Sequence, residues 1–172
     1  MTSDGTYCLN LTVNDSIVLI NSTTLWNISL DTTSPNINGT INNTAPKINE
    51  IINASFNISD ATGLSSANIS INISGNPAQT FLFDISGTSD KASQNITINL
   101  TRGNVINITG FAVDLENNIK QNSTLLTIAT TPPLPATISN QSGILFLSNQ
   151  TISWVASDVD NDDLNFTVYF SK

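Results

Sequence analysis

The sequence predicts an all-β protein in which short antiparallel strands form facing sheets, and three features of the chain support this fold class. Apolar and small polar residues alternate along many stretches, such as NITINLT at 95–101. A period of two places successive side chains on opposite faces of a strand. Gly, Pro and Asp separate these stretches, as expected of turns. No stretch has the 3.6-residue period of an amphipathic helix.

Seven expected strands follow the Thr-Thr-Ser-Pro linker, each bounded by turn residues. Their approximate ranges are 36–41, 52–59, 68–74, 81–85, 95–101, 105–113 and 124–129. The core-facing positions of the second strand are Ile52, Ala54, Phe56 and Ile58. Gly110 also lies at an inward position, on the sixth strand. Seven short strands with regular turn signals are typical of an Ig-like β-sandwich, which is the architecture we expect.

Three pairs of similar features recur at a single spacing of 98 residues. The segment GTYCLNLTVNDS has a weaker echo in GNVINITGFAVD, and two proline junctions and two strand-ending aspartates share the offset. The paired positions are Gly5 and Gly103, Pro35 and Pro133, and Asp60 and Asp158. A shared offset indicates a tandem array of Ig-like units. We expect one complete domain at 35–131, with the C-terminal strands of a domain at 1–34 and the N-terminal strands of another at 132–172.

Two parts of the chain carry a resemblance to known families. GTYCLNLTVNDS followed by WNISLDTTSP resembles the final hairpin of Ig-like repeats in bacterial and archaeal cell-surface proteins. ISWVASDVDNDDLNFTVYF resembles the opening strands of fibronectin type III-like or cadherin-like modules. The resemblance implies tandem sandwiches at a cell surface, and the motif density described below resembles archaeal surface proteins. The chain departs from the family pattern at Ile106, where an aromatic residue is usual.

Each flanking piece lacks the strands that would cover one face of its sheet. Trp26 lies on the apolar face of the first piece and Trp154 on that of the last, and both are expected in a core rather than on a ligand platform. Each piece alone would expose an apolar face and unpaired edges. Two explanations stay open. The chain is an excerpt of a longer array, or the tail of one copy completes the head of the next in a filament joined by β-strand complementation.

Charge is scarce in this chain, and its balance is negative. Charged residues make up 10% of the sequence, against about 25% in an average soluble domain, and the net charge is -8. An acidic chain without a basic stripe is a poor partner for nucleic acid or an anionic membrane. No apolar run approaches the length of a membrane span and no signal peptide follows Met1. We therefore expect no direct membrane insertion and, if the chain is exported, a mature or excised piece.

The chain has no histidine and a single cysteine, Cys8. These counts exclude intrachain disulfides, zinc clusters and Cys/His nucleophilic sites. We identify no catalytic residue and expect a protein that is not an enzyme. Cys8 lies between the inward positions Tyr7 and Leu9, so its side chain is expected on the outer face.

The acceptor motif for N-glycosylation, Asn-x-Ser/Thr, recurs throughout the sequence. It begins at 17 of the 25 asparagines: Asn10, Asn14, Asn21, Asn27, Asn38, Asn42, Asn53, Asn57, Asn68, Asn72, Asn95, Asn99, Asn107, Asn122, Asn140, Asn149 and Asn165. Because Asn fits strands poorly and lysine is scarce, we predict covalent N-glycans on the outward faces of strands, with the x residue packed inward. The alternatives are the alternation of apolar and small polar residues by itself, and compositional drift in an AT-rich genome.

The densest acidic group is SDVDNDD at 157–163. Asp158, Asp160 and Asp162 are spaced as oxygen ligands of a hard cation, and calcium is the metal that they would suit. The other interpretation is a plain acidic turn with Asn-Asp at its tip. No other cofactor is expected. Isolated carboxylates at strand ends are expected to accept backbone N–H bonds in turns: Asp15, Asp60 and Asp114.

These features favour an extracellular structural glycoprotein, an Ig-like repeat unit of a cell-surface filament, stalk or surface layer. Its partners would be copies of itself or neighbouring repeats. Stacked sandwiches with short Thr/Pro linkers span distance, and a sugar coat supplies the hydration that charge gives elsewhere. Two rivals stay open: an adhesin or glycan-binding module, and an accessory domain of a larger surface enzyme. An adhesin would need an exposed aromatic platform, for which Tyr169 is the candidate.

Overall fold

The computed structural model describes residues 3–14, 16, 20–22, 26–73, 76–139 and 153–169, and these ranges contain β-strands and no helix. The predicted all-β fold class is therefore confirmed. A helix long and apolar enough to cross a membrane is absent from the described ranges. The strands are β1 (Gly5–Leu9), β2 (Thr12–Asn14), β3 (Ile20–Ser22), β4 (Trp26–Leu30), β5 (Asn36–Ile41), β6 (Ile51–Ser59), β7 (Leu64–Ile73), β8 (Gln79–Asp84), β9 (Ser89–Thr97), β10 (Val105–Asp114), β11 (Ile119–Thr127), β12 (Thr137–Ser139) and β13 (Ser153–Val155).

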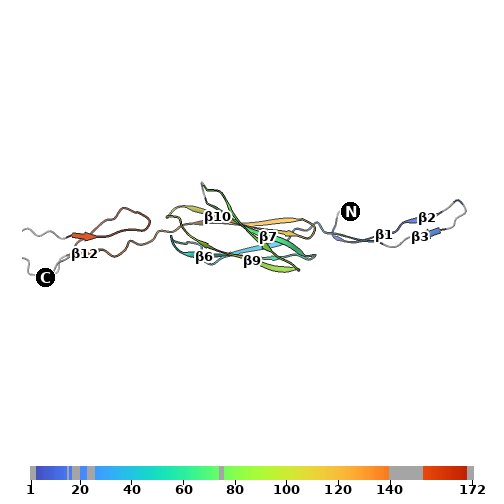
Figure 1. Cartoon of the computed structure of the whole chain (residues 1–172), viewed down its shortest axis with the longest axis horizontal. Helices are drawn as coiled ribbons and strands as arrows, with labels where there is room; N and C mark the ends of the chain where they lie inside the picture. Colours follow the sequence, from blue (N-terminus) through green and yellow to red (C-terminus); the bar gives the residue numbers. More distant parts are fainter. Residues whose placement is uncertain are drawn as a thin grey trace, which may run out of the picture.

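Strands β5 to β11 form two antiparallel sheets, which together we call the central unit (Figure 1). One sheet has the order β5-β6-β9 and the other the order β11-β10-β7-β8. The two sheets lie against each other, and a single cluster of buried apolar side chains fills the space between them. The chain changes sheets between β6 and β7, between β8 and β9, and between β9 and β10.

The core is built from the inward positions that the alternation predicts. On β6, Ile52, Ala54, Phe56 and Ile58 are each at most 1% exposed. The other buried apolar residues come from both sheets and the loops beside them: Ile37, Leu64, Ala67, Ile69, Ile71, Ile85, Ala92, Ile96, Ile98, Ile106, Ile108, Ala112, Leu126 and Ile128. Isoleucine dominates because a β-branched side chain packs well on a pleated surface.

Phe56 is the largest fully buried side chain, and two glycines make room for its ring. Gly39 lies opposite Phe56 in the β5–β6 pairing, and a methyl group on it would approach the ring to 2.6 Å. Gly110 on β10 faces the ring from the other sheet, where a methyl group would approach it to 2.5 Å. The expected inward glycine on the sixth strand is therefore confirmed, and its small size lets the two sheets close over Phe56.

Some strand boundaries differ from the predictions. The strand expected at 95–101 ends at Thr97, because the chain beyond it bonds to a bend instead of continuing beside β6. In that bend Asn49 has a φ of 67°, its N–H donates to Ile98 O at 2.8 Å, and Ile98 N–H donates to Glu50 O at 2.9 Å. Strand β7 begins at Leu64, before the strand expected at 68–74, and β11 begins at Ile119, before the strand expected at 124–129.

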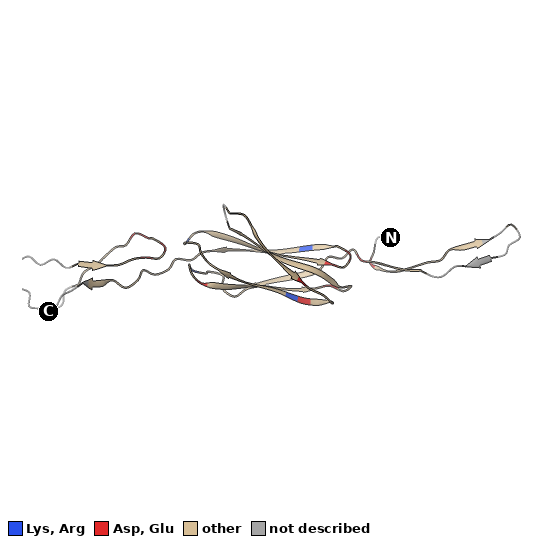
Figure 2. Cartoon of the chain, viewed as in Figure 1, with Lys and Arg blue, Asp and Glu red and all other residues tan. Residues whose placement is uncertain are grey.

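Two smaller antiparallel pieces extend from opposite ends of the central unit (Figure 1). The N-terminal hairpin consists of β1 paired with β4 and, further out, β2 paired with β3. The C-terminal hairpin consists of β12 paired with β13 and the segment that follows β13. Charged residues are sparse along the described part of the chain (Figure 2).

Each hairpin exposes one apolar face, as the sequence predicts for an uncovered sheet. In the N-terminal hairpin the exposed fractions are 57% for Leu9 and 68% for Trp26, which lie opposite each other. In the C-terminal hairpin Ile138 lies opposite Trp154, and their exposed fractions are 62% and 39%. The rings of Trp154 and Phe166 lie 5.8 Å apart between centroids on this open face. Within this chain, therefore, both tryptophans lie outside a closed core.

Candidate functional site: an asparagine surface and two acidic junctions

The first candidate site is the set of asparagines that begin the glycosylation motifs. Four of the 17 lie outside the described side chains: Asn14, Asn21, Asn140 and Asn149. None of the remaining 13 is buried. Nine are exposed: Asn10, Asn27, Asn38, Asn42, Asn57, Asn72, Asn95, Asn99 and Asn165. Four are half-buried: Asn53, Asn68, Asn107 and Asn122.

The x residue of these motifs packs inward at five places in the central unit. The buried x residues are Ala54, Ile58, Ile69, Ile96 and Ile108. The strand period explains the pattern, because the asparagine and the hydroxyl residue two positions later share the face opposite to x. On these strands the x residue builds the core and the other two residues lie on the opposite face, where the hydroxyl residues Ser55 and Thr109 are themselves buried.

Asn122 breaks this rule and corrects the predicted orientation. It lies opposite the buried Gly110 in the β10–β11 pairing and shares its face of β11 with the buried Leu126. Its Nδ2 donates to the carbonyl oxygen of Ile37 at 3.1 Å, which joins β11 to β5 of the other sheet. The earlier start of β11 explains the error, since Asn122 was expected to precede this strand.

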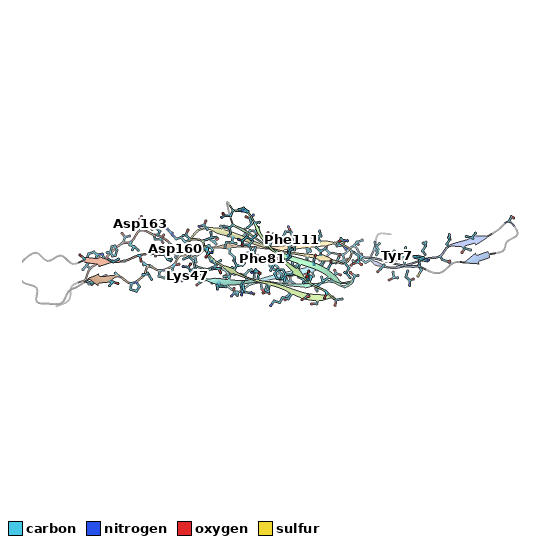
Figure 3. The ribbon with its side chains drawn as sticks, in the orientation of Figure 1. Tyr7, Lys47, Phe81, Phe111, Asp160 and Asp163 are labelled. Atoms are coloured by element: carbon cyan, nitrogen blue, oxygen red, sulfur yellow. The ribbon has the colours of Figure 1, made fainter. Side chains whose placement is uncertain are left out.

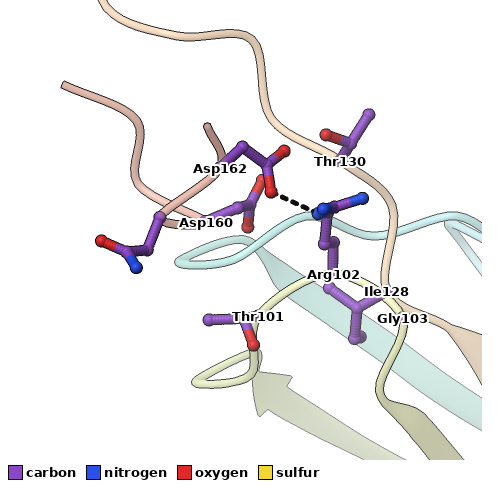
Figure 4. Close-up of a pocket in the computed structure, with 8 residues that line it drawn as sticks. Thr101, Arg102, Gly103, Ile128, Thr130, Asp160 and Asp162 are labelled. Carbon is purple, nitrogen blue, oxygen red and sulfur yellow. Dashed lines mark ion pairs between the residues drawn. The ribbon is translucent and has the colours of Figure 1, made fainter. Parts of the chain in front are cut away.

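The second candidate site is the acidic group where the C-terminal hairpin meets the central unit (Figures 3 and 4). Asp158, Asp160 and Asp162 each place a carboxylate oxygen within 4.8 Å of the others. Asp160 is 7% exposed and accepts a hydrogen bond from Thr131 N–H at 2.5 Å. Arg102 of the central unit approaches from the β9–β10 loop, with its Nε 2.5 Å from Asp162 Oδ1. These contacts join the linker, the loop and the central unit.

Two oxygens at this junction have no partner among the described residues. Asp160 Oδ1 and Thr131 Oγ1 are both shielded from solvent, and neither makes a hydrogen bond. A buried carboxylate oxygen without a donor costs free energy unless a cation or a donor satisfies it. Calcium takes six to eight oxygen ligands, so three carboxylates and a hydroxyl form a fitting donor set. The guanidinium of Arg102 already compensates part of this charge at Asp162.

The acidic group at the other junction was not anticipated from the sequence. Asp31, Asp114 and Glu116 place carboxylate oxygens within 4.8 Å of one another where the N-terminal hairpin meets the central unit. Thr62 Oγ1 lies 2.8 Å from Asp60 Oδ1 and bonds to Asp31. Asp31 is remote in sequence from Asp114 and Glu116, so only the packing of the hairpin end against the central unit brings these carboxylates together.

The isolated carboxylates at strand ends accept backbone N–H bonds, as predicted. Asp114 is fully buried, and its Oδ1 accepts from the N–H groups of Glu116 and Asn118 at 2.9 and 2.8 Å. Asp60 Oδ1 accepts from the N–H groups of Thr62 and Gly63 at 2.9 and 3.2 Å. Asp15 lies outside the described residues.

Two carboxyl groups near the N-terminal junction have lowered pKa values. Burial by itself would raise the pKa of Asp60, but the Thr62 N–H, the Thr62 hydroxyl and the Gly63 N–H together hold it below its ordinary value. The hydroxyls of Thr32 and Thr33 and the N–H of Thr32 lower the pKa of Asp4. Both carboxylates are therefore ionised and hydrogen-bonded at neutral pH.

Cys8 lies on the exposed outer face of the N-terminal hairpin, as predicted from its neighbours. Its Sγ donates to Asn27 Oδ1 at 3.2 Å, across the β1–β4 pairing. The thiol is therefore hydrogen-bonded to the amide oxygen of Asn27 on this face.

Comparisons with known proteins say little about this chain. No protein-family model matches it, and no curated protein matches it. Among solved structures it is similar to the crystal structure of Spo0M, a sporulation control protein from Bacillus subtilis, at 6% identity and a TM-score of 0.41. The match covers 58% of this chain and spans about half, 51%, of that one. A TM-score of this size does not define a shared fold.

Proposed function

We propose that this protein is a non-catalytic, extracellular structural glycoprotein, an Ig-like repeat unit of a cell-surface filament, stalk or surface layer. One observation carries the proposal: the motif asparagines of the described side chains are all exposed or half-buried, and five of the x residues between them lie in the buried core. Glycans on such a surface would supply hydration to a chain with 10% charged residues. They would also shield exposed apolar side chains such as Leu82, which is 82% exposed.

The strand order supports the Ig-like part of the proposal. Constant-type Ig domains place the first, second, fifth and fourth strands on one sheet and the third, sixth and seventh on the other. The central unit has the same order except that its fourth strand, β8, pairs with the third, β7. Movement of that strand between sheets is a variation within the sandwich architecture. We therefore propose that residues 35–131 form one complete Ig-like domain.

The hairpins support a tandem arrangement. A shift of 98 residues places Gly5 of β1 on Gly103, just before β10, and Ser153 of β13 on Ser55 of β6. The N-terminal hairpin then corresponds to the end of a unit and the C-terminal hairpin to the start of one. In the central unit these two parts belong to opposite sheets. Their open apolar faces are thus suited to strands of neighbouring repeats or to β-strand complementation by a second copy.

The mechanism would be mechanical. Hydrogen bonds and the Arg102–Asp162 ion pair tie each hairpin to the central unit, which limits bending at the two junctions. Asn118 Nδ2 donates to Asp31 O at 3.2 Å at the first junction, and Thr131 N–H donates to Asp160 at 2.5 Å at the second. Repeated units with short, fastened linkers make a rod rather than a flexible string.

The adhesin alternative has one favourable observation. The C-terminal hairpin has an apolar groove lined by Trp154, Phe166 and Tyr169, and Tyr169 is 88% exposed. Aromatic side chains in a groove could hold a sugar ring. The same exposure follows, however, from the uncovered sheet to which these residues belong. Full burial of this groove in an assembled array would remove the adhesin alternative.

Two measurements on the native protein test the proposal. The intact mass of the protein purified from its source should exceed the chain mass by sugar increments, because many motifs would be occupied. Electron microscopy of cells labelled with an antibody to this chain should show fibres, stalks or a lattice. A mass equal to that of the bare chain would contradict the glycoprotein role, and label confined to the cell interior would contradict the surface role.

A further inference from the structure

The register of the central unit places motif asparagines directly opposite each other. Asn53 on β6 pairs with Asn95 on β9, and Asn107 on β10 pairs with Asn72 on β7. A third pair, Asn38 on β5 and Asn57 on β6, has both members exposed. Side chains in such pairs have Cβ atoms about 5 Å apart. A glycan attached to one member occupies the space above the other, so a difference in burial or hydrogen bonding within a pair decides which member is the better acceptor.

In the first pair, the amide of Asn53 is fully engaged. Its Nδ2 donates to Ser93 Oγ at 3.0 Å and to Asn95 Oδ1 at 2.8 Å, and its Oδ1 lies 3.2 Å from the same Ser93 Oγ. An amide nitrogen has two hydrogens, and both are in use. Asn95 is exposed and contributes only its Oδ1 to this network, so its Nδ2 is open.

In the second pair, the members differ in burial. Asn107 is half-buried, and its Oδ1 is shielded from solvent without a hydrogen-bond partner. Asn72 is exposed. Asn107 is therefore the more enclosed member of this pair, and Asn72 offers its carboxamide more open space for a sugar.

Asn122 is closed to modification for a third reason. Its side chain lies on the inner face of β11, opposite the buried Gly110, and its Nδ2 donates to Ile37 O of the facing sheet. A sugar on this nitrogen would lie between the two sheets. A chain modified there could not reach the observed packing.

We propose that these five motif asparagines of the central unit divide into two classes, and this inference rests on the proposed glycosylation. Asn72 and Asn95 accept glycans, while Asn53, Asn107 and Asn122 stay unmodified. Asn53 ties β6 to β9 within one sheet, and Asn122 ties β11 to β5 of the facing sheet. At an accepting residue the Nδ2–H bond breaks and a bond forms to C1 of a sugar from a phosphate-activated glycosyl donor. The phosphate group of the donor leaves with the bonding electrons, and the amide proton is released.

The first test is site-resolved glycopeptide mass spectrometry of the folded, native protein. We expect sugar on Asn72 and Asn95 and none on Asn53, Asn107 or Asn122. A sugar on any of these last three would overturn the division while leaving the glycoprotein role intact. Absence of sugar at every motif would instead overturn the glycoprotein role, and the inference with it.

The second test uses the unglycosylated recombinant full chain. Asn122→Asp keeps the size of the side chain but replaces the donor nitrogen by a carboxylate oxygen that faces Ile37 O. It should lower Tm by about 4–8 °C, while the matched control Asn72→Asp should leave Tm within about 2 °C. Asn53→Asp, which loses two donated hydrogen bonds, should behave like Asn122→Asp. Equal small shifts in all three variants would show that these amides do not hold the fold.

Discussion

The substitution Gly110→Ala tests how the two sheets close over the core. A methyl group at this position would lie 2.5, 2.6 and 2.7 Å from three ring atoms of Phe56. Favourable contacts between carbon atoms are at about 3.5–4.0 Å, so the overlap is about 1 Å. The ring cannot retreat, because Gly39 on the neighbouring strand meets the same ring with a similar clearance.

The expected cost of this overpacking is about 1–3 kcal/mol, and the lack of space for retreat places it near the upper end of that range. For a cooperative unit of about 100 residues, each kcal/mol lowers Tm by about 4–8 °C. Urea denaturation followed by circular dichroism would give the free energy of unfolding for the wild-type chain and the variant.

A double-mutant cycle with Phe56→Ala provides the control. Phe56→Ala alone should cost about 3–5 kcal/mol, because it leaves a cavity in a closed core. In that background the Gly110→Ala methyl group enters vacated space, so its cost should disappear. An equal cost of Gly110→Ala in both backgrounds would show that the penalty comes from the backbone and not from contact with the ring.

Three further predictions concern the carboxylates. Asp114→Ala should destabilise the chain by about 1–3 kcal/mol in urea denaturation, because it leaves the N–H groups of Glu116 and Asn118 without their acceptor. A cost equal to that of the exposed control Asp84→Ala would contradict this prediction. The pKa of Asp60 lies below 3.8, so its stabilisation is complete above pH 3.8 and is lost as the pH falls through the lower folded-state value. Thermal unfolding at pH 7 and pH 2 should therefore show a smaller acid-induced fall in Tm for Asp60→Asn than for the wild type, and equal falls would argue against it. Millimolar calcium should raise the Tm of the wild type but not of Asp160→Asn, and equal shifts in both would exclude Asp160 as a ligand.

Much of the strand framework could be predicted from local patterns. The strand expected at 36–41 matches β5, and the four predicted inward residues of β6 are all buried. These predictions succeed because the period of two fixes which side chains share a face, wherever the strand pairs. They fail at strand ends, as at Thr97, because a boundary depends on the segment that the chain meets next.

One of the candidate sites could also not be predicted from local patterns. The positions of the motif asparagines and the acidic group at 158–162 are visible in the sequence. The cluster of Asp31, Asp114 and Glu116 is not, because Asp31 follows β4 while the other two lie at the end of β10 and in the turn after it. They meet only where the hairpin joins the central unit.

The strand period, the scarcity of charge and the density of acceptor motifs can be read from the sequence, because they are properties of neighbouring residues. The enclosure of Phe56 by Gly39 and Gly110, the pairing of Asn53 with Asn95 and the place of Asn122 between the sheets become visible only in the folded chain. The physical reason is register. Contacts between remote strands depend on how the strands are aligned, and a shift of one residue would turn each of these side chains to the opposite face.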